Sequence, residues 1–347
     1  GSIWSDIMTD VQEPDTTSTI NDISNTTSTT PRVPPKSGFK FDSNVLMKEL
    51  EPRVRELRNS LGLLRENITA LVGLGFVIFI IIIALFAPVI CPPTSADTMY
   101  IPRDFKQPKP PGADGHILGT GNWGTDMLYG IVWGARTSII ISLFVVITGV
   151  LIGLVVGSIA GYYGGRIDDL MMRITDVFLS LPALILAMAI ASILERSLEN
   201  MMLALIIVWW PSYARLIRAQ VLSIKESTYV EAARAIGAKT DRILFKHIVP
   251  NAISPLIVAA TMDIGAVVLV AAGLSYIGFG VSTGSAEWGR MVSDGQSWFL
   301  STVYWEGKAY TASWVVIFPG LAILMFTMGF SLLGDGLRDI LDPRLRR

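Results

Sequence analysis

Six apolar runs in this chain are each long enough to cross a lipid bilayer as a helix. A bilayer core of about 30 Å needs roughly 20 apolar residues in helical form. The composition agrees, because 51% of the residues are hydrophobic and only 16% are charged, whereas soluble domains carry about 25% charged residues. We therefore predict an all-α, polytopic membrane protein with six transmembrane helices. The predicted spans are residues 70–90, 138–160, 171–194, 201–217, 252–277 and 313–333.

The distribution of Lys and Arg predicts the orientation of these spans. Positive residues are enriched in the cytoplasmic segments of membrane proteins. If the N-terminus is cytoplasmic, the outer segments hold only 7 of the 28 Lys and Arg residues. Both termini are therefore predicted to be cytoplasmic, in a multi-pass protein of the cell membrane that contacts lipid. The seven outer residues are Arg103, Lys106, Lys109, Arg136, Arg196, Arg290 and Lys308.

The spans divide the chain into regions of different character. Residues 1–50 are mostly polar, rich in Thr, Ser, Asp and Asn, and too poor in large apolar residues to fold. They are predicted to be a disordered cytoplasmic tail. The remaining predicted regions are an amphipathic cytoplasmic helix at 51–69, a transmembrane domain at 70–347 with long outer segments at 91–136 and 278–312, and a cytoplasmic segment at 218–250.

The second outer segment contains Trp288, Trp298 and Trp305. Trp favours the boundary between membrane and water, because its ring is apolar and its N–H needs a partner. Short helices that lie over the outer mouth would fit this segment, and a plain surface loop fits it equally well.

The residue inventory excludes several kinds of site. Cys91 is the only cysteine and the chain has two His, so no disulfide can form within it and no protein metal site is expected. The sequence has no G-x-x-x-x-G-K-[ST] phosphate loop. The chain is therefore not expected to be an enzyme or to bind a cofactor, and no nucleic-acid partner is expected.

The cytoplasmic segment carries the signals of a short capped helix. Thr228 and Glu231 fit a capping box, in which each side chain bonds to a free backbone N–H of the first turn. Gly237 suits a left-handed cap at the C-terminal end. A second short helix is predicted to start at Asp241 and to end before Pro250. From the pattern alone, an ordinary surface helix explains this segment.

A resemblance changes that interpretation. Glu231-Ala232-Ala233, then Gly237, then Pro250 thirteen residues later, resemble the EAA signature of ABC importer permeases. The signature usually has Ile and Leu at the positions of His247 and Val249, a departure that resembles the peptide-importer branch. Further stretches resemble the C-type dipeptide/oligopeptide permeases from about Leu57 to the C-terminus. They are His116-Ile-Leu-Gly-Thr120 with Gly124, Asp126, Gly134 and Arg136, then Gly161-Tyr-Tyr-Gly-Gly165, Trp210-Pro-Ser-Tyr-Ala-Arg215, Leu274-Ser-Tyr-Ile-Gly-Phe-Gly280 and Leu333-Gly-Asp-Gly-Leu-Arg-Asp-Ile-Leu-Asp-Pro-Arg344. The family usually has Asp and Arg where this chain has Gly121 and Thr125.

The resemblance implies the transmembrane domain of a type I ABC importer. Such a chain forms half of a pathway for di- or oligopeptides, beside a second related permease. Two ATPase subunits bind ATP and Mg, and an extracellular binding protein delivers the substrate. The ATPase-coupling residues would be Glu231, Ala232, Ala233, Gly237 and Pro250, with Glu231 and Gly237 the strongest candidates for docking.

Alternatives to this function remain open from the sequence. The chain could be an ATPase-independent channel, a secondary transporter or a membrane scaffold. Within the same family, the substrate could be an oligosaccharide or a nickel complex.

A few residues inside the predicted spans are expected to matter. Asp263 lies about 12 residues into the fifth span, roughly 18 Å along the helix. A carboxylate at that depth faces the bundle interior or a water-filled cavity, so Asp263 is a candidate pathway residue or a structural partner. Pro182 and Pro211 predict kinks in their helices. Gly149, Gly153 and Gly157 predict a ridge for close helix packing.

Overall fold

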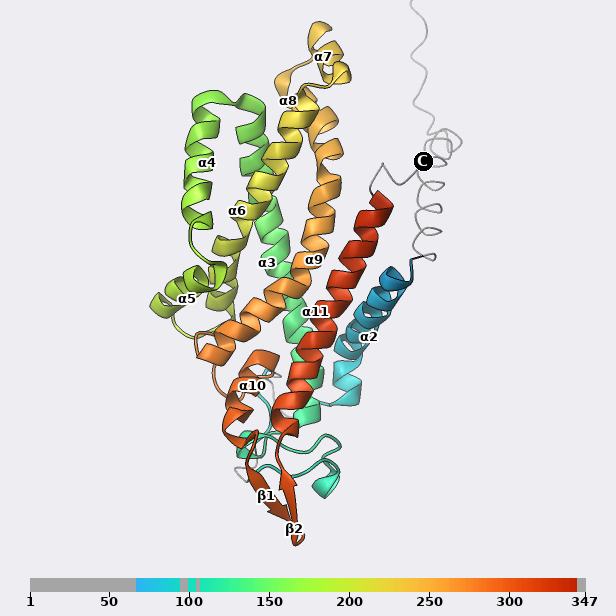
Figure 1. The fold of residues 1–347 in the computed structure, drawn as a ribbon, viewed down its shortest axis with the longest axis vertical. Coiled ribbons are helices and arrows are strands. Elements are labelled where there is room, and N and C mark those ends of the chain that lie inside the picture. Colours follow the sequence, from blue (N-terminus) through green and yellow to red (C-terminus); the bar gives the residue numbers. More distant parts are fainter. Residues whose placement is uncertain (1–66, 94–98, 104–106, 342–347) are drawn as a thin grey trace, which may run out of the picture. The chain divides into compact units, whose positions relative to one another are not determined.

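The computed structural model describes residues 67–93, 99–103 and 107–341. The predicted tail at 1–50 and nearly all of the predicted helix at 51–69 lie outside this range. Five helices in the described part are long and apolar enough to cross a membrane. They are α2 (Ile68–Ile90), α3 (Met127–Tyr163), α6 (Leu198–Lys225), the helix Thr240–Ile277 that includes α9 (Val249–Ile277), and α11 (Trp314–Leu341) (Figure 1).

The predicted third span is broken in two. Helix α4 (Gly165–Leu179) and helix α5 (Ala183–Ile193) are long and apolar enough to cross a membrane only when they are taken together. They meet at an angle of 86°. Pro182 is the N-cap of α5 and has an extended ψ of 131°. Leu181 stands directly before this proline, and a residue in that position avoids the helical region. The predicted span over 171–194 is therefore not one straight helix, but the kink predicted at Pro182 is confirmed. Pro211, by contrast, lies inside the continuous helix α6.

The glycine ridge of α3 packs on α6, as predicted. A Cβ atom built on Gly153 would lie 2.5 Å from the Cβ of Tyr213, and one on Gly157 would lie 2.3 Å from the carbonyl oxygen of Ala214. Neither distance leaves room for a side chain, so the two backbones approach closely only because these positions are glycine.

We expect Gly157→Ala to destabilise the protein by about 1–3 kcal/mol, because α6 must move to accept the methyl group. Gly75→Ala on α2 is the matched control, since nothing lies within 4 Å of a Cβ built there. It removes a glycine from a helix and should gain about 0.5–1 kcal/mol. The midpoint of thermal unfolding of the purified protein in detergent measures both effects. Equal midpoints for the two variants would contradict the packing account.

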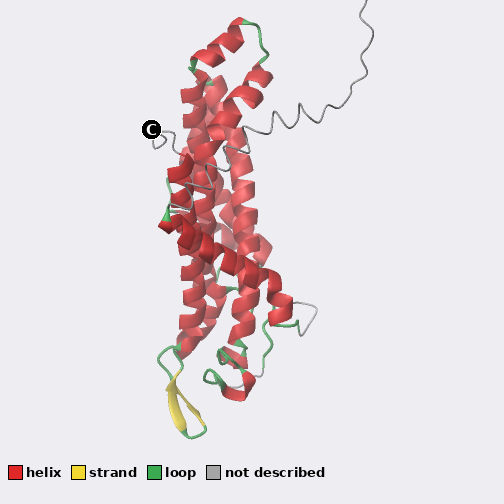
Figure 2. Cartoon of the chain, turned by 90° about the vertical axis from the view of Figure 1, so that its right-hand side faces the viewer, coloured by secondary structure: helices red, strands yellow, loops and turns green. Residues whose placement is uncertain are grey.

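The segment 278–312 is folded and is not a plain loop. It contains the predicted short helix, α10 (Trp288–Gly295), and a two-stranded antiparallel hairpin of β1 (Thr302–Trp305) and β2 (Lys308–Thr311) that the all-helical prediction did not include (Figure 2). Trp288 is only 2% exposed, so its ring packs against other protein residues and not against lipid. Three indole N–H groups join this region to α3 and to the segment before it. Trp288 donates to the carbonyl of Ile131 in α3, whereas Trp298 donates to Oδ1 of Asn122 and Trp314 to the carbonyl of Thr120, each at 3.1 Å.

Glu287 caps α10 from a buried position. Its carboxylate accepts hydrogen bonds from the backbone N–H groups of Gly289 and Arg290 at 2.9 and 2.8 Å. Burial raises the pKa of Glu287 above its ordinary value, although these hydrogen bonds and the Arg290 charge oppose the shift.

We therefore expect the native state to lose stability as the pH rises from the ordinary Glu pKa of about 4.3 through the raised native value. The folded carboxyl group holds its proton more tightly than the unfolded one, so protonation favours folding. Glu287→Gln should remove this part of the pH dependence. Thermal midpoints of both proteins measured from acidic to neutral pH test the expectation, and parallel pH profiles would contradict it.

Candidate functional site

The predicted cytoplasmic segment forms a separate small unit at the opposite end of the helices from the hairpin (Figure 1). It consists of α7 (Thr228–Ala235), α8 (Thr240–Ile243) and a turn of π-helix (Leu244–Ile248) that leads into α9. Since α6 ends at Lys225, this unit is joined directly to two long helices, α6 on one side and α9 on the other.

The predicted capping box is wrong. Ser227 is the N-cap and Thr228 is the first helical residue, and no side chain caps the helix. The backbone carbonyl of Ser227 accepts from the N–H groups of Val230 and Glu231, while its hydroxyl donates to the carbonyl of Ile224 at 2.6 Å. Thr228 is one position too far along the chain for its hydroxyl to act as the cap.

The left-handed cap at Gly237 is confirmed. Its φ is +78°, its N–H bonds to the carbonyl of Arg234, and the N–H of Ala238 bonds to the carbonyl of Ala233. This pair of bonds is a Schellman motif, which closes the free carbonyls at the end of a helix. No atom lies within 4 Å of a Cβ built on Gly237, so backbone conformation alone favours glycine here.

The second helix does not stop before Pro250. The chain is continuously helical from Thr240 to Ile277, and Pro250 lies in the first turn of α9. A proline is tolerated there because the first turn needs no N–H donor from it. The wider π turn precedes it, with the N–H of Val249 bonded to the carbonyl of Leu244.

The two faces of this unit differ in exposure. Val230, Ile243 and Ile248 are at most 1% exposed and anchor the unit to the long helices. Of the predicted coupling residues, Glu231, Ala232, Gly237 and Pro250 are exposed, whereas Ala233 is buried and belongs to the packed face. The predicted residues thus divide between exposed positions and one packed position.

The sequence reasoning missed two residues of the exposed face. Ile236 is 85% exposed and Phe245 is 70% exposed. Large apolar side chains in this state, next to the exposed turn at Gly237, are typical of a surface that another protein covers. The only signal in the sequence was the position of Ile236 directly before the capping glycine, and Phe245 had none.

A ring on α3 holds α7 in place. The guanidinium of Arg234 lies 5.9 Å from the centre of the Tyr162 ring, and the ammonium of Lys225 lies 6.0 Å from it. Each cation is at a distance at which a cation–π contact is worth about 0.5–1 kcal/mol at an exposed site. Arg234 thus gives α7 a weak contact with the end of α3.

Two ion pairs join α4 to α6. Arg218 forms two hydrogen bonds to the Asp168 carboxylate, at 2.5 and 2.6 Å, and this pair is largely buried. Arg215 pairs with Asp176 at 2.5 Å, and both side chains of this pair are more than half exposed.

Asp263 is half-buried in α9 and lies beside Tyr213 and Trp209 of α6. The Tyr213 hydroxyl is close but does not meet the geometry of a hydrogen bond, and it has no hydrogen-bond partner among the described residues. A groove of about 370 Å³ between α6, α9 and α11 is lined by the neighbouring Met262 and not by Asp263. The carboxyl group therefore faces the interior of the helix bundle.

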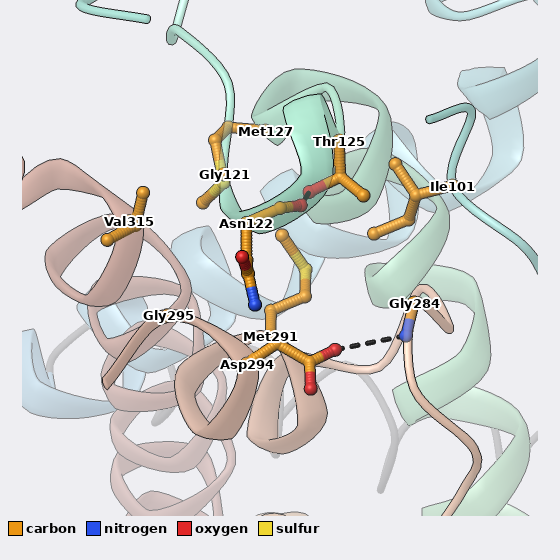
Figure 3. A pocket seen from close by; sticks show the side chains of 10 residues that line it. All are labelled: Ile101, Gly121, Asn122, Thr125, Met127, Gly284, Met291, Asp294, Gly295 and Val315. Atoms are coloured by element: carbon orange, nitrogen blue, oxygen red, sulfur yellow. Dashed lines mark hydrogen bonds between the residues drawn. The ribbon is translucent and has the colours of Figure 1, made fainter. Parts of the chain in front are cut away.

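A small cavity lies near the hairpin end of the structure (Figure 3). Asp294 borders it and accepts a hydrogen bond from the N–H of Gly284 at 3.0 Å. The cavity has a volume of about 10 Å³, which is close to the minimum for a single water molecule. It is therefore too small for a peptide. Among the described residues, no three His, Cys, Asp or Glu side chains are grouped to hold a metal ion.

Long apolar helices, with an exposed helical unit between two of them, define a polytopic membrane protein. Residues 153–347 match the family described as binding-protein-dependent transport system inner membrane component, and residues 58–111 match the N-terminal transmembrane domain of oligopeptide transport permease C. The chain therefore belongs to the family of binding-protein-dependent transport permeases.

Curated relatives agree with this membership. The dipeptide transport system permease protein DppC of Alkalihalophilus pseudofirmus is 39% identical over 83% of this chain and 90% of its own length. The oligopeptide transport system permease protein OppC of Bacillus subtilis is 39% identical over 82% and 88%. The di/tripeptide permease DppC of Pseudomonas aeruginosa is 39% identical over 81% and 90%.

The inward-facing MetNI methionine ABC transporter is 22% identical, with a TM-score of 0.49, over 62% of this chain and 97% of that one. This likeness adds nothing to the assignment. The family membership confirms the type I ABC importer fold and a transport role without catalysis. It gives no support to a self-contained channel, a secondary transporter or a scaffold.

Proposed function

We propose that this chain forms half of the translocation pathway of an ATP-driven importer of di- or oligopeptides, and that α7 is the helix through which an ATPase drives it. The observation that carries the proposal is the exposed face of α7 and its turn, on a unit anchored to both α6 and α9. A push on such a unit moves two long helices together.

The proposed partners follow from this role. A second related permease completes the pathway, two ATPase subunits bind ATP and Mg, and an extracellular binding protein delivers the substrate. The termini and α7 lie in the cytoplasm, in agreement with the excess of Lys and Arg on that side. The hairpin of β1 and β2 then lies outside the cell.

The peptide substrate is supported by the relatives, which are named as dipeptide, di/tripeptide and oligopeptide permeases. Mass spectrometry of the ligand that copurifies with the binding protein tests it. A bound peptide is the expected result, whereas an oligosaccharide or a nickel complex would replace the peptide proposal.

We expect Asp263→Asn to lower the stability of the chain more than its transport per assembled complex. The carboxyl group faces Tyr213 and Trp209 in the bundle interior, so its change disturbs packing first. The yield of assembled complex and the uptake per complex separate the two effects. Full assembly with lost uptake would instead place Asp263 in the pathway.

A further inference from the structure

The break between α4 and α5 leaves backbone groups without helical partners. The last carbonyls of a helix and the first N–H groups of the next have no partner within their own helices. Helix α4 ends at Leu179 and α5 begins at Ala183 after a turn of 86°. Ser180, Leu181 and Pro182 are all exposed, so this irregular backbone is not covered by the rest of the chain.

Contacts place the break within the hydrocarbon core of the membrane. The ring of Phe178, two residues before the break, lies 5.6 Å from the ring of Trp210 on α6. A Cβ built on Gly153 of α3 would lie 3.0 Å from the carbonyl of Trp210. Gly153 lies well inside residues 137–165, which carry no charge. About 20 of these residues fill the bilayer core, so Trp210 and the break beside it lie within the core.

An exposed ion pair lies on the same face. Asp176 is one turn before Ser180, and the N–H of Ser180 bonds to its carbonyl at 2.9 Å. The carboxylate of Asp176 pairs with Arg215, and these two side chains are 59% and 56% exposed. Arg215 follows Ala214, whose carbonyl lies against Gly157, so the pair also lies level with the uncharged part of α3.

Lipid cannot cover this face. Irregular backbone at membrane depth occurs only where protein buries it or water reaches it, and charged side chains there face the interior or a water-filled cavity. Burial of the exposed ion pair by another protein would remove its water at a cost of several kcal/mol. A water-filled cavity therefore explains both the exposed irregular backbone and the exposed ion pair.

We propose that the face formed by Asp176, Ser180 and Arg215, named here the α4–α6 face, lines the water-filled translocation pathway and contacts the charged ends of a zwitterionic peptide. The carboxylate of Asp176 suits the ammonium end of such a substrate and the guanidinium of Arg215 suits its carboxylate end. This inference rests on the proposed function and names the part of the chain that meets the substrate.

Cysteine labelling of the assembled complex tests the inference. The background is Cys91→Ser, which removes the only native thiol. Ser180→Cys probes the α4–α6 face, and Val155→Cys is the control, since it is 58% exposed on the continuous apolar helix α3 at similar depth. The probe is a charged, water-soluble methanethiosulfonate, which reacts with the thiolate form.

We expect Ser180→Cys to react roughly tenfold faster or more than Val155→Cys, because each pKa unit by which lipid raises a thiol pKa lowers its thiolate fraction about tenfold. Alanyl-alanine should slow the reaction at Ser180→Cys, and N-acetyl-alanyl-alanine amide, which lacks charged ends, should slow it less. Equal rates at the two positions, or equal protection by the two compounds, would overturn the inference.

The same complexes separate this inference from the proposed function. Alanyl-alanine uptake driven by ATP, together with an unreactive Ser180→Cys, would reject only the α4–α6 face. A reactive Ser180→Cys in a complex that transports no peptide would reject the peptide substrate, and with it the contact to the ends of a peptide, but not the water-filled α4–α6 face.

Discussion

Glu231→Lys is expected to abolish ATP-driven uptake while the chain still inserts and folds. Glu231 is exposed in the first turn of α7, where the charge change costs the helix only about 0.3–1 kcal/mol. In a docked interface, the loss of one member of a charge pair costs more, about 2–5 kcal/mol of binding free energy. The loss of uptake should therefore be roughly 30-fold or more. Uptake and ATPase activity of the assembled complex in proteoliposomes measure it.

Glu306→Lys, the same charge change on the exposed hairpin turn, is the matched control and should leave uptake unchanged. Normal uptake by a correctly assembled Glu231→Lys complex would remove Glu231 from the docking face.

Gly237→Asp is also expected to abolish ATP-driven uptake, because it disturbs the C-terminal end of α7. The position has a φ of +78°, which Asn and Asp tolerate better than other residues that carry a side chain. Asp also adds a negative charge at the C-terminal end of α7, which the helix dipole disfavours. Gly237→Asn should therefore retain more uptake than Gly237→Asp, and the reverse order would contradict this account.

Asp168→Asn is expected to destabilise the chain by about 1.5–3 kcal/mol, because it weakens two hydrogen bonds between charged groups in a partly buried pair. Asp176→Asn is the matched control, since its pair with Arg215 is more than half exposed and such a pair contributes about 0–1 kcal/mol. Chemical or thermal unfolding in detergent compares the two. The double variant Asp168→Leu/Arg218→Leu should be less harmful than Asp168→Asn, and equal losses for Asp168→Asn and Asp176→Asn would contradict the buried-pair account.

Most of the fold could be predicted from the sequence, because the length of an apolar run is a local property. The glycine ridge of α3 and the cap at Gly237 were also predicted correctly, since each depends on one helix and its close neighbours. The site residues of α7 were predicted from a resemblance to a family and not from a local pattern. In the structure Glu231 is exposed, whereas Ala233 is buried.

The remaining features depend on contacts that no local pattern contains. Pro211 lies inside a continuous helix, whereas Pro182 precedes a new helix after a break, because the outcome depends on whether neighbours replace the lost backbone bonds. The Asp168–Arg218 pair joins residues 50 positions apart. The exposure of Ile236 and Phe245 follows from the turn between α7 and α8 and not from their hydrophobicity.

Cross-linking from Ile236 tests most directly the central claim that α7 docks on an ATPase. Ile236→Cys in the Cys91→Ser background, with a short thiol-reactive photo-cross-linker, probes the exposed face in the assembled complex. Mass spectrometry should identify an ATPase subunit as the cross-linked protein, and Tyr304→Cys on the hairpin should give no such product. An Ile236→Cys complex that transports normally yet forms no cross-link to an ATPase would contradict the account.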